Sequence, residues 1–450
     1  MARVPARTPK GMRDYLPADM IKRRYVFDTV RDVFESFGFE PIDTPVLELR
    51  ETLFGSGMGE DAEKLVYYAQ HAGGKEELAL RYDLTVPLSR FVAEHENDIK
   101  LPFRRYHIAP VWRGERPQKG RYREFYQCDA DIVGVRGPAA DAEVMQVVYT
   151  ALRRLGFADF TIKMNNRKLL TGLGIYAGIS DEQLPSLYRI IDKTDKIGLD
   201  GVAGMLAESN LPAESVTRLV NILRLDGTGD AQQRLAAIGH LREELDGVAI
   251  AQEGLDELEY LTYAADAFGM SGDNVALDLT MVRGLGYYTG PIFETVITKP
   301  DNLGSVQGGG RYDELVGRFR GQSLPTTGIS LGIERLVDLM EMLDLYPASV
   351  SGTTVVQALV TVFDEDSQLG SLRLAADLRE AGLRVETYMD PRKNLGKQIG
   401  YADSKGIGLV VIAGPDEQAQ GLVRLKRLHD GEEIVVQRAA VGAEAAAFLG

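Results

Sequence analysis

The sequence predicts an α+β protein of several domains, because strand-like and helix-like segments occur in separate blocks. Residues 104–112 and 122–127 read as two strands joined by a turn of glycine and proline, the pattern of an antiparallel hairpin. Residues 166–262 read almost entirely as helices, and residues 354–450 alternate strand and helix as in a small α/β domain. A chain of 450 residues is also too long for one hydrophobic core, so two or three domains are expected.

The N-terminal third of the chain supplies further predicted elements. Apolar residues recur at helical spacing over residues 19–37, so a helix is expected there, and a strand-like segment follows at 39–48. A short apolar helix is expected within 79–92, after the RYDLT sequence, and a longer helix over 140–156. The only cysteine, Cys128, lies in a strand-like run, and a single cysteine excludes an internal disulfide.

The middle of the chain changes character. Segment 166–262 carries sixteen acidic and nine basic residues, and its expected helices cover 183–193, 200–208, 214–224, 231–245 and 253–268. Apolar residues alternate over 274–283, which predicts a half-buried strand. A glycine-rich segment occupies 304–316, residues 328–340 read as a strand running into a helix, and residues 342–353 read as a linker.

The composition limits the possible functions. The formal net charge of −15 argues against nonspecific binding to nucleic acid, so any such partner has to be met by local basic patches. No apolar run approaches the roughly 18 residues that span a bilayer, and the N-terminus has no apolar stretch of signal-peptide length. A cytoplasmic protein without a membrane partner is therefore expected. The five histidines are scattered without metal-ligand spacing, so no metal-binding residue is predicted.

Residues 104–127, called the arginine hairpin below, hold six arginines and one lysine in this acidic chain. Like charges so close together repel one another unless anions lie among them, and arginine is suited to bidentate binding of phosphate oxygens. The charges are interleaved with aromatic residues such as Trp112 and Phe125. A solvated basic loop is the alternative, but the pattern favours a phosphate-binding hairpin.

Four segments occur in an order and spacing that resemble class II aminoacyl-tRNA synthetases: FGFEPIDTPVLE (37–48), the arginine hairpin, RGLGYYTG (283–290) and GISLGIERL (328–336). Within that class they resemble the histidyl-tRNA synthetase family. The resemblance covers nearly the whole chain, from KGMRDYLP at 10–17 to the C-terminal α/β segment. One short motif is weak evidence, whereas four in the family's order are a specific signal.

The resemblance implies a catalytic domain with an antiparallel sheet flanked by helices, a helical insertion and an anticodon-binding α/β domain. The implied boundaries are 1–165 and 263–341 for the catalytic parts, 166–262 for the insertion, 342–353 for a linker and 354–450 for the anticodon-binding domain. Residues 37–48 resemble the motif that forms the dimer interface in this class, so a homodimer is implied. From chemistry alone, an ordinary helix–strand connection is the favoured interpretation of that segment.

The arginine hairpin resembles the ATP-binding motif 2 of the class. By resemblance, Arg113 holds the α-phosphate of ATP and Arg121 contacts the γ-phosphate. Glu115 contacts the adenine, and Phe125 stacks on it. Arg335, in GIERL, resembles the motif 3 arginine that lies against the adenine and the γ-phosphate, although an arginine on a helix surface is the alternative.

The RGLGYYTG segment resembles a signature of histidyl enzymes. Arg283 matches an arginine that reaches the α-phosphate and the substrate carboxylate, and with Arg113 it is the implied catalytic residue. The implied histidine-binding residues also include Asp83, Thr85, Gln127, Asp131, Tyr287 and Tyr288. Carboxylates suit the ammonium and imidazole N–H donors of histidine. Without the resemblance, Asp131 is equally well a turn residue, and the tyrosines are more often core aromatics.

One position departs from the family pattern. The family usually reads Arg-Gly-Leu-Asp-Tyr-Tyr, whereas this chain has Gly286 in the aspartate position. The arginine and both tyrosines are kept, so the departure concerns the detail of the pocket. The glycine-rich sequence GGGRYDEL at 308–315 resembles a strand that lines the pocket, although a turn would also explain it.

The implied reaction has two steps. The carboxylate of histidine attacks the α-phosphorus of ATP to give histidyl-adenylate and pyrophosphate, and the adenylate then acylates the 3′ end of tRNA(His). Arg116 and Gln118 resemble residues that meet the acceptor end of the tRNA. Mg²⁺ is expected to accompany ATP, held largely by phosphates, and no protein ligand is assigned to it.

Two alternatives stay open. Paralogues of this family serve as regulatory subunits of ATP phosphoribosyltransferase, but they typically lose the anticodon domain and the ATP-binding arginines, which this chain keeps. A synthetase for glycine, threonine or proline would share the C-terminal domain type. The RGLGYYTG segment argues against that second alternative.

Overall fold

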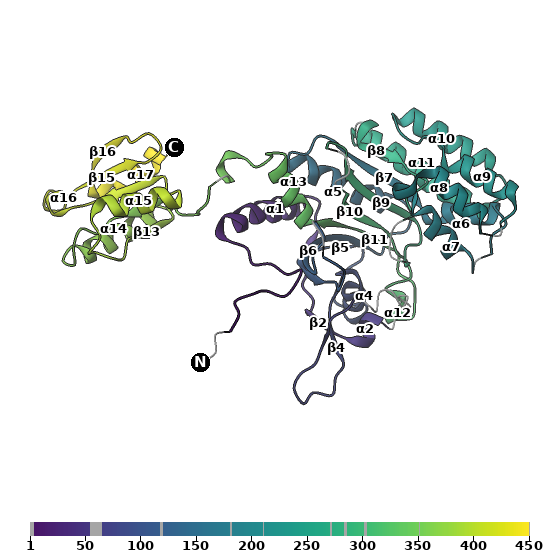
Figure 1. Cartoon of the computed structure of the whole chain (residues 1–450), viewed down its shortest axis with the longest axis horizontal. Helices are drawn as coiled ribbons and strands as arrows, with labels where there is room; N and C mark the ends of the chain where they lie inside the picture. The colour runs from purple at the N-terminus through teal and green to yellow at the C-terminus, as the bar shows by residue number, and fades with distance from the viewer. Residues whose placement is uncertain are drawn as a thin grey trace. The chain divides into compact units, whose positions relative to one another are not determined.

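The computed structural model describes residues 4–54, 65–117, 120–180, 182–209, 211–270, 272–282, 286–300, 304–350 and 352–449. The chain divides into two compact units, one of Met1–Asp14 with Val26–Leu345 and the other of Tyr15–Tyr25 with Tyr346–Gly450. Each unit contains a sheet with helices packed on it (Figure 1), so the α+β class expected from the sequence is confirmed. The finer domain boundaries stay predictions.

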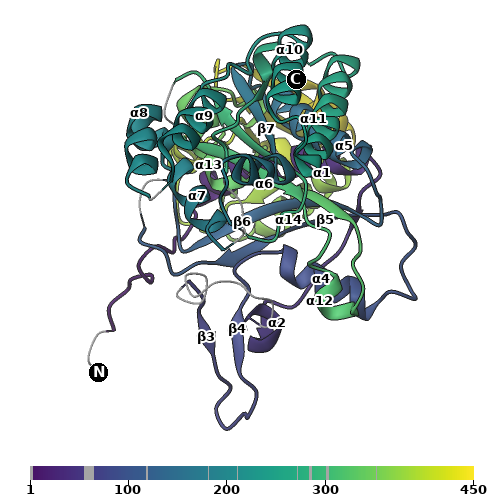
Figure 2. The same cartoon turned by 90° about the vertical axis from the view of Figure 1, so that its right-hand side faces the viewer.

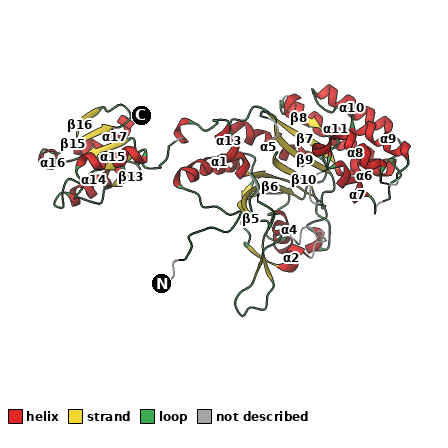
Figure 3. Cartoon of the chain, in the orientation of Figure 1, coloured by secondary structure: helices red, strands yellow, loops and turns green. Residues whose placement is uncertain are grey.

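The first unit is built on an eight-stranded sheet in the order β1-β5-β6-β11-β10-β9-β7-β8. Among these strands, neighbours are antiparallel from β5 through to β7, and the edge strands β1 and β8 pair in parallel. Figure 3 shows this sheet in yellow. The strands are β1 (Glu40–Pro41), β5 (Phe103–Trp112), β6 (Glu124–Val133), β7 (Phe160–Asn166), β8 (Val275–Leu277), β9 (Pro291–Ile297), β10 (Ser305–Arg311) and β11 (Thr326–Gly332).

The arginine hairpin forms β5 and β6, which pair from Phe103 opposite Val133 to Trp112 opposite Glu124. The indole N–H of Trp112 also donates a hydrogen bond to the Glu124 carboxylate at 3.0 Å. Strand β6 continues beyond the predicted end at residue 127, because the polar residues of CDADIV alternate with buried Cys128, Ala130 and Ile132 as a strand requires.

Helices cover the large sheet. α5 (Ala139–Arg154) packs against β6, β10 and β11, and α13 (Ile333–Met342) packs against β6 and β10. α1 (Pro17–Ser36) and α4 (Thr85–Glu94) confirm the predicted helices at the start of the chain. Figure 2 shows α4 beside α2 (Arg50–Phe54) and α12 (Gly317–Arg320). A second, three-stranded sheet is formed by β2 (Leu47–Leu49), β4 (Leu78–Leu80) and β3 (Tyr68–Ala69).

A group of helices follows β7 and lies beside it in Figure 1. They are α6 (Arg167–Tyr176), α7 (Leu184–Ile191), α8 (Thr194–Ala207), α9 (Ala213–Leu223), α10 (Ala231–Glu244) and α11 (Ala249–Ala267). The sequence pattern does not predict α6, because Gly172 and Gly174 lower its helix propensity. Packing requires Gly172, because a Cβ there would lie 2.5 Å from the Ala251 Cβ. Gly174 leaves room for the Leu184 side chain, whose terminal methyl group would lie 2.1 Å from an added Cβ.

Two predicted strands are shorter than expected. The segment 39–48 holds two short strands, β1 and β2, because the Asp43 carboxylate accepts the Thr44 N–H at 2.8 Å and Pro45 has no N–H to donate. The strand predicted over 274–283 ends at Leu277. Asp278 accepts hydrogen bonds from the N–H of Thr280 at 3.0 Å and from its hydroxyl at 2.6 Å, which makes a turn.

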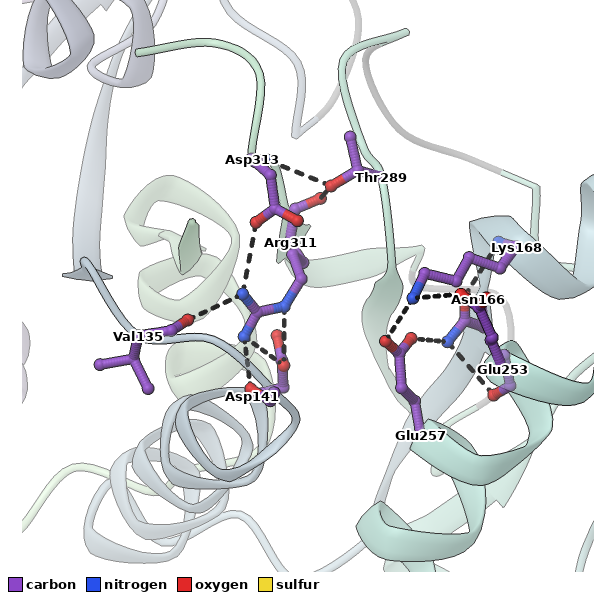
Figure 4. Close-up of polar contacts among 11 residues, drawn as sticks. Val135, Asp141, Asn166, Lys168, Glu253, Glu257, Thr289, Arg311 and Asp313 are labelled. Atoms are coloured by element: carbon purple, nitrogen blue, oxygen red, sulfur yellow. Dashed lines mark hydrogen bonds and ion pairs between the residues drawn. The ribbon is translucent and has the colours of Figure 1, made fainter. Parts of the chain in front are cut away.

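Two polar networks, one buried and one partly buried, tie the helices to the sheet (Figure 4). On β10, the guanidinium of Arg311 donates to the Asp141 carboxylate of α5 at 3.0 and 2.7 Å and to the Val135 carbonyl at 3.0 Å. Asn166 at the end of β7 and Lys168 in the first turn of α6 donate to the Glu257 carboxylate of α11 at 2.6 and 2.8 Å. The first network fixes a strand whose other residues line the cavity described below.

The second unit has a mixed sheet in the order β13-β12-β14-β15-β16, formed by β12 (Ala358–Val360), β13 (Val385–Thr387), β14 (Leu409–Ile412), β15 (Leu422–Arg427) and β16 (Glu433–Gln437). α14 (Gln368–Glu380) and α17 (Val441–Leu449) pack with Ala358 and Val360, whereas α15 (Leu395–Lys405) packs with Leu359. Because successive strand residues face opposite sides, helices cover both faces of this sheet. The α/β architecture predicted for the C-terminal segment is confirmed, and α16 (Pro415–Ala419) is a further short helix.

No helix in the described part of the chain is long and apolar enough to cross a membrane.

The substitution Arg311→Met should lower the free energy of unfolding by about 3–5 kcal/mol, because it leaves the Asp141 carboxylate buried without a counter-charge. The double variant Arg311→Met/Asp141→Asn removes both charges and should recover much of that loss. Urea unfolding followed by far-UV circular dichroism measures the difference. Lys299→Met is the control, because it removes only an exposed ion pair with Asp159 and should cost less than about 1 kcal/mol. Equal losses in the single and double variants would contradict this account.

Candidate active site

A cavity of about 340 Å³ lies between the arginine hairpin, β10, β11 and the start of α13. Residues from segments far apart in the sequence line it, among them Asp83, Thr85, Arg113, Glu115, Arg121, Phe125, Gln127, Asp131, Tyr287, Tyr288 and Arg335. The fold therefore brings together eleven residues that the sequence resemblance selects. Arg116 is exposed and does not line the cavity, and Arg283 and Gln118 lie outside the described residues.

Strand β6 supplies one wall of the cavity. Phe125, Gln127, Asp129 and Asp131 are spaced by two, so they point to the same side of the sheet. Strand β11 is paired with β6, and it places Ser330 opposite Asp129 and Gly328 opposite Asp131. The wall is thus one continuous surface of two antiparallel strands.

Three arginines, Arg113, Arg121 and Arg335, form what we call the arginine side of the cavity. Arg113 Nε donates to the Tyr82 carbonyl at 3.0 Å, and its guanidinium lies 5.1 Å from the centre of the Phe125 ring. Arg121 Nε lies 3.2 Å from the Glu115 carboxylate. Guanidinium groups gathered on one wall of a cavity are suited to a chain of phosphates.

Arg335 joins the hairpin turn to β10. Its guanidinium donates to the carbonyl of Gly120 at 3.3 Å and to the carbonyl of Ser305. A Cβ at Gly304 would lie 2.6 Å from the Arg335 guanidinium, so glycine is needed there for this approach. The helix α13 that carries Arg335 also carries Glu334, whose carboxylate accepts the Tyr126 N–H at 3.1 Å. Arg335 is thus fixed by the turn it faces, unlike an arginine on a helix surface.

Three buried carboxylates, Asp83, Asp129 and Asp131, form the acidic side of the cavity; they are 1%, 2% and 3% exposed. Burial raises the pKa of Asp83 to about 6 and that of Asp129 to about 7, and the guanidinium of Arg105 opposes both shifts. Burial also raises the pKa of Asp131, against the opposing effects of Arg105 and of the Tyr312 hydroxyl. A cation that enters here would find anions already removed from water.

Three acceptor atoms on this side have no hydrogen-bond partner within the described ranges: Asp83 Oδ2, Gln127 Oε1 and Asp131 Oδ2. Asp131 Oδ2 forms an ion pair with Arg105, so Asp83 and Gln127 carry the acceptors without a partner. The remaining polar atoms of both residues are occupied. Asp83 Oδ1 accepts the Val86 N–H at 3.2 Å, and Gln127 Nε2 donates to the Ser330 hydroxyl at 2.8 Å. A buried acceptor without a donor costs free energy, so this end of the cavity is complementary to a ligand rich in N–H groups.

Tyrosines complete the acidic side. The rings of Tyr287 and Tyr288 lie 5.0 Å apart, and Tyr312 lies 5.7 Å from Tyr287 in an edge arrangement. Burial raises the pKa of all three phenols, so they stay protonated and can donate hydrogen bonds. Gly286, just before them, is exposed, and a Cβ there would meet no atom within 4 Å. The departure from the family pattern at this position thus leaves the tyrosines in the cavity wall.

The glycine-rich segment forms strand β10 and is not a turn. A Cβ at Gly309 would lie 2.3 Å from the Gly328 carbonyl, and one at Gly310 would lie 2.6 Å from the Pro291 carbonyl, so close strand packing requires both glycines. A Cβ at Gly308 would meet nothing within 4 Å, although Gly308 lines the cavity. Gly308 and Gly309 both line the cavity, and Gly308 is the one at which an added Cβ would meet no atom.

Sequence reasoning missed several residues. Asp129 and Tyr312 line the cavity, and Arg105 lies buried beneath it. Asp129 could have been predicted, because it lies two residues from both Gln127 and Asp131 on a strand and therefore on the same face. Arg105 carries no such signal, because its burial depends on the pairing of β5 with β6.

The N-terminal segment contacts the arginine hairpin, and its sequence does not predict these contacts. The Gly11 carbonyl accepts the Arg123 N–H at 2.9 Å. The guanidinium of Arg13 lies 3.4 Å from the centre of the Tyr122 ring. Gly11 has φ +84°, and a Cβ there would lie 2.8 Å from Pro117, so no other residue fits well. The strand arm that leads out of the hairpin turn is therefore supported from outside the sheet.

Comparison with known proteins covers nearly the whole chain. Residues 11–336 match the family described as Histidyl-tRNA synthetase, and residues 357–446 match the family described as Anticodon binding domain. The chain is 44% identical to the Histidine--tRNA ligase of Rhodopirellula baltica over 94% of this chain and 93% of the relative. It is 41% identical to the Histidine--tRNA ligase of Bacteroides fragilis over 95% and 96% of the two chains.

Solved structures agree with the sequence relatives. The crystal structure of histidyl-tRNA synthetase from Nostoc sp. PCC 7120 superimposes with a TM-score of 0.87 at 33% identity, covering 99% of this chain and 100% of that one. An ATP phosphoribosyltransferase regulatory subunit/histidyl-tRNA synthetase from Bacillus halodurans C superimposes with a TM-score of 0.75 over 91% and 98% of the two chains. At 24% identity, that second structure shows a shared fold alone. By sequence and by architecture, this chain belongs to the histidyl-tRNA synthetase family.

Proposed function

We infer that the chain is a histidine–tRNA ligase, an enzyme that activates L-histidine with ATP and transfers it to the 3′ end of tRNA(His). The family and its curated relatives support this activity. The observation that carries it in the structure is one cavity with arginines on one side and buried, unpartnered acceptors on the other. Such a cavity suits a polyphosphate and an amino acid bound side by side.

We propose that ATP lies on the arginine side. Arg113 and Arg121 would hold the α- and γ-phosphates, and Arg335 would lie against the adenine and the γ-phosphate. Phe125 would stack on the adenine and Glu115 would contact its edge. The contact between Arg113 and Phe125, at 5.1 Å, supports the proposal because it brings a phosphate-binding group next to a ring that can stack on a base.

Histidine would lie on the acidic side. We propose that the α-ammonium binds Asp83, Thr85 and Gln127, since Asp83 Oδ2 and Gln127 Oε1 lack donors among the described residues. Asp131 would accept an imidazole N–H, and Tyr287 and Tyr288 would enclose the ring. The burial of these groups supports the proposal, because a hydrogen bond in a desolvated site discriminates strongly against ligands that cannot form it.

The chemistry needs no general base, because a carboxylate is already ionised near neutral pH. In the first step the histidine carboxylate oxygen attacks the α-phosphorus, and the bond to the pyrophosphate oxygen breaks. Arg113 and Arg283 are the proposed catalytic residues, since fixed cations stabilise the charge that develops on the phosphate oxygens. Arg283 comes from the family resemblance alone.

The magnesium ion is part of this proposal. Mg²⁺ would enter with ATP and be held mainly by phosphate oxygens, as is usual for nucleotide-bound magnesium. Glu115 and Glu334 are carboxylates in the cavity wall near the arginines, but Glu115 faces Arg121 and Glu334 accepts the Tyr126 N–H. We assign no protein ligand to the ion.

The tRNA partner follows from the same family. We propose that Arg116 and Gln118, in the hairpin turn, meet the acceptor end of tRNA(His), and that the second unit binds the anticodon. The match of residues 357–446 to an anticodon binding domain supports the second part. The exposure of Arg116 supports the first, because a residue that meets a large partner has to be reachable. The proposed site of action is the cytoplasm.

The regulatory-subunit alternative is less well supported. The sequence relatives at about 40% identity are histidine–tRNA ligases. Regulatory paralogues typically lack the ATP-binding arginines and the C-terminal domain. This chain has both the arginines and the second unit.

We also propose a homodimer through the segment that resembles motif 1. The small sheet, whose strand β2 begins inside this segment, exposes the apolar side chains of Leu47 (42%), Leu49 (41%) and Tyr68 (56%), and Val46 just before β2 is 40% exposed. Apolar groups clustered on one small sheet are typical of an interaction surface.

ATP–pyrophosphate exchange should depend on L-histidine and should not occur with glycine, threonine or proline. The reason is that, of these four amino acids, only histidine offers N–H donors at both the α-ammonium and the side chain. Isotope exchange into ATP measures this. Clear exchange with another amino acid would overturn the specificity, and no exchange with any amino acid would favour the regulatory-subunit alternative.

The substitution Asp83→Asn should lower kcat/KM for histidine about 10- to 100-fold at pH 8, because a hydrogen bond to a charged group contributes about 1.5–3 kcal/mol. Asp83 has a pKa of about 6, so acid protonates the wild-type carboxyl and removes its advantage. The ratio of wild-type to variant kcat/KM should therefore fall as the pH drops from 8 through 6. This ratio cancels the titration of free histidine, whose imidazole has a pKa of about 6.5. A ratio that stays constant with pH would contradict the role of Asp83.

The double substitution Leu47→Glu/Leu49→Glu should shift the protein from dimer to monomer, because it places charges in the proposed interface. Size-exclusion chromatography with light scattering measures the mass. Leu369→Glu is the matched control, since Leu369 is 69% exposed in the second unit. A monomeric wild-type protein at micromolar concentration would disprove the homodimer.

A further inference from the structure

One arginine of the hairpin lies inside the protein and has no role in ATP binding. Arg105 is 0% exposed, and on the paired strands it stands directly opposite Asp131. Its Nη2 atom lies 2.6 Å from Asp131 Oδ2, which makes a buried ion pair. The neighbouring Arg104 points the other way and pairs with Glu143 of α5 at 2.7 Å. Burying a charged group costs free energy, so a buried arginine is expected to have a specific role.

The Asp131 carboxylate is held from three sides. Arg105 contacts Oδ2, and the Tyr312 hydroxyl donates a hydrogen bond to Oδ1. Gly328 lies opposite on β11, and a Cβ there would fall 1.8 Å from Asp131 Oδ1. The orientation of this carboxylate is therefore fixed by a cation, a donor and the absence of a side chain, before any ligand enters.

The charge balance under the cavity explains why the cation is needed. Asp83, Asp129 and Asp131 are all buried, and Arg105 opposes the effect of burial on each of them. Arg113, which is half-buried, acts on Asp83 as well. The phenols of Tyr82, Tyr287, Tyr288 and Tyr312 also face these carboxylates. His107 on β5 contacts Asp43 at 2.9 Å. Arg105 is thus the fully buried cation that serves all three acids.

We propose that Arg105 is a positioning residue that makes the cavity specific for an amino acid with an N–H donor in its side chain. It favours the ionised form of Asp131 and aims it at the site. A carboxylate can accept about four hydrogen bonds, so beyond the contacts with Arg105 and Tyr312 a side chain without a donor would leave acceptor sites of this desolvated group unfilled. Unpaired buried acceptors reject ligands far more strongly than a change of shape does. This inference rests on the proposed binding of histidine and goes beyond it, because it gives the specificity to a residue outside the cavity wall.

The test compares Arg105→Met and Arg105→Lys with the control Arg104→Met in histidine-dependent pyrophosphate exchange. Arg105→Met should raise the KM for histidine at least 10-fold and leave the KM for ATP within about 2-fold of wild type. Arg105→Lys keeps the charge without the planar guanidinium and should give an intermediate KM. Arg104→Met should behave as wild type. The acid side of the histidine kcat/KM profile should move to higher pH in Arg105→Met, because loss of the cation favours the protonated acids.

A second measurement isolates specificity. The preference for histidine over 2-thienylalanine, a ring of similar size without an N–H, should fall at least 10-fold in Arg105→Met. A purely structural role would lower the melting temperature and the active fraction without changing KM, the pH profile or this preference. If Arg105→Met does not fold, Arg105→Lys carries the test. Wild-type KM, pH profile and preference in a folded Arg105 variant would overturn the inference, whereas absence of exchange in the wild type would overturn the proposed function.

Discussion

The antiparallel pairing of β5 with β6 is the constraint on which the rest of the site depends, because it places the arginines of the hairpin turn and the acids of β6 at different ends of one cavity. The hairpin turn carries Arg113 and Arg121, while the alternation along β6 sets Asp129 and Asp131 further along the same wall. If the two groups met, they would neutralise each other and leave nothing for a ligand. Strand register, more than any single contact, gives the cavity two ends of opposite charge.

Much of the fold and the site could be predicted from the sequence. The hairpin, the helical segment and the C-terminal α/β unit follow from periodicity, and the cavity residues follow from motifs in a known order. What could not be predicted depends on contacts between distant segments. Helix α6 was missed because its glycines weaken the helix signal, while their purpose lies in the packing of Ala251 and Leu184. Arg105 reads like any other arginine of a basic run, and only strand pairing shows that it is buried.

The glycines are a second example of what the sequence alone cannot predict. A run of three glycines suggests either a turn or a ligand site, and the sequence cannot choose between them. In the structure Gly309 and Gly310 serve the packing of neighbouring strands, and Gly308 faces the cavity. Gly328 is the first residue of the GISLGIERL segment, but that motif does not show that the missing side chain makes room for the Asp131 carboxylate. Why a position needs glycine can be seen only from the atoms that surround it in the structure.

The single tryptophan of the chain gives the protein an intrinsic optical reporter. Trp112 ends β5, its indole is hydrogen-bonded to Glu124 across the hairpin, and Arg113 is the next residue. Indole emission responds to nearby charge and to changes in its hydrogen bond. A nucleotide bound at Arg113, as proposed, would therefore be expected to change the emission of Trp112, without background from a second indole.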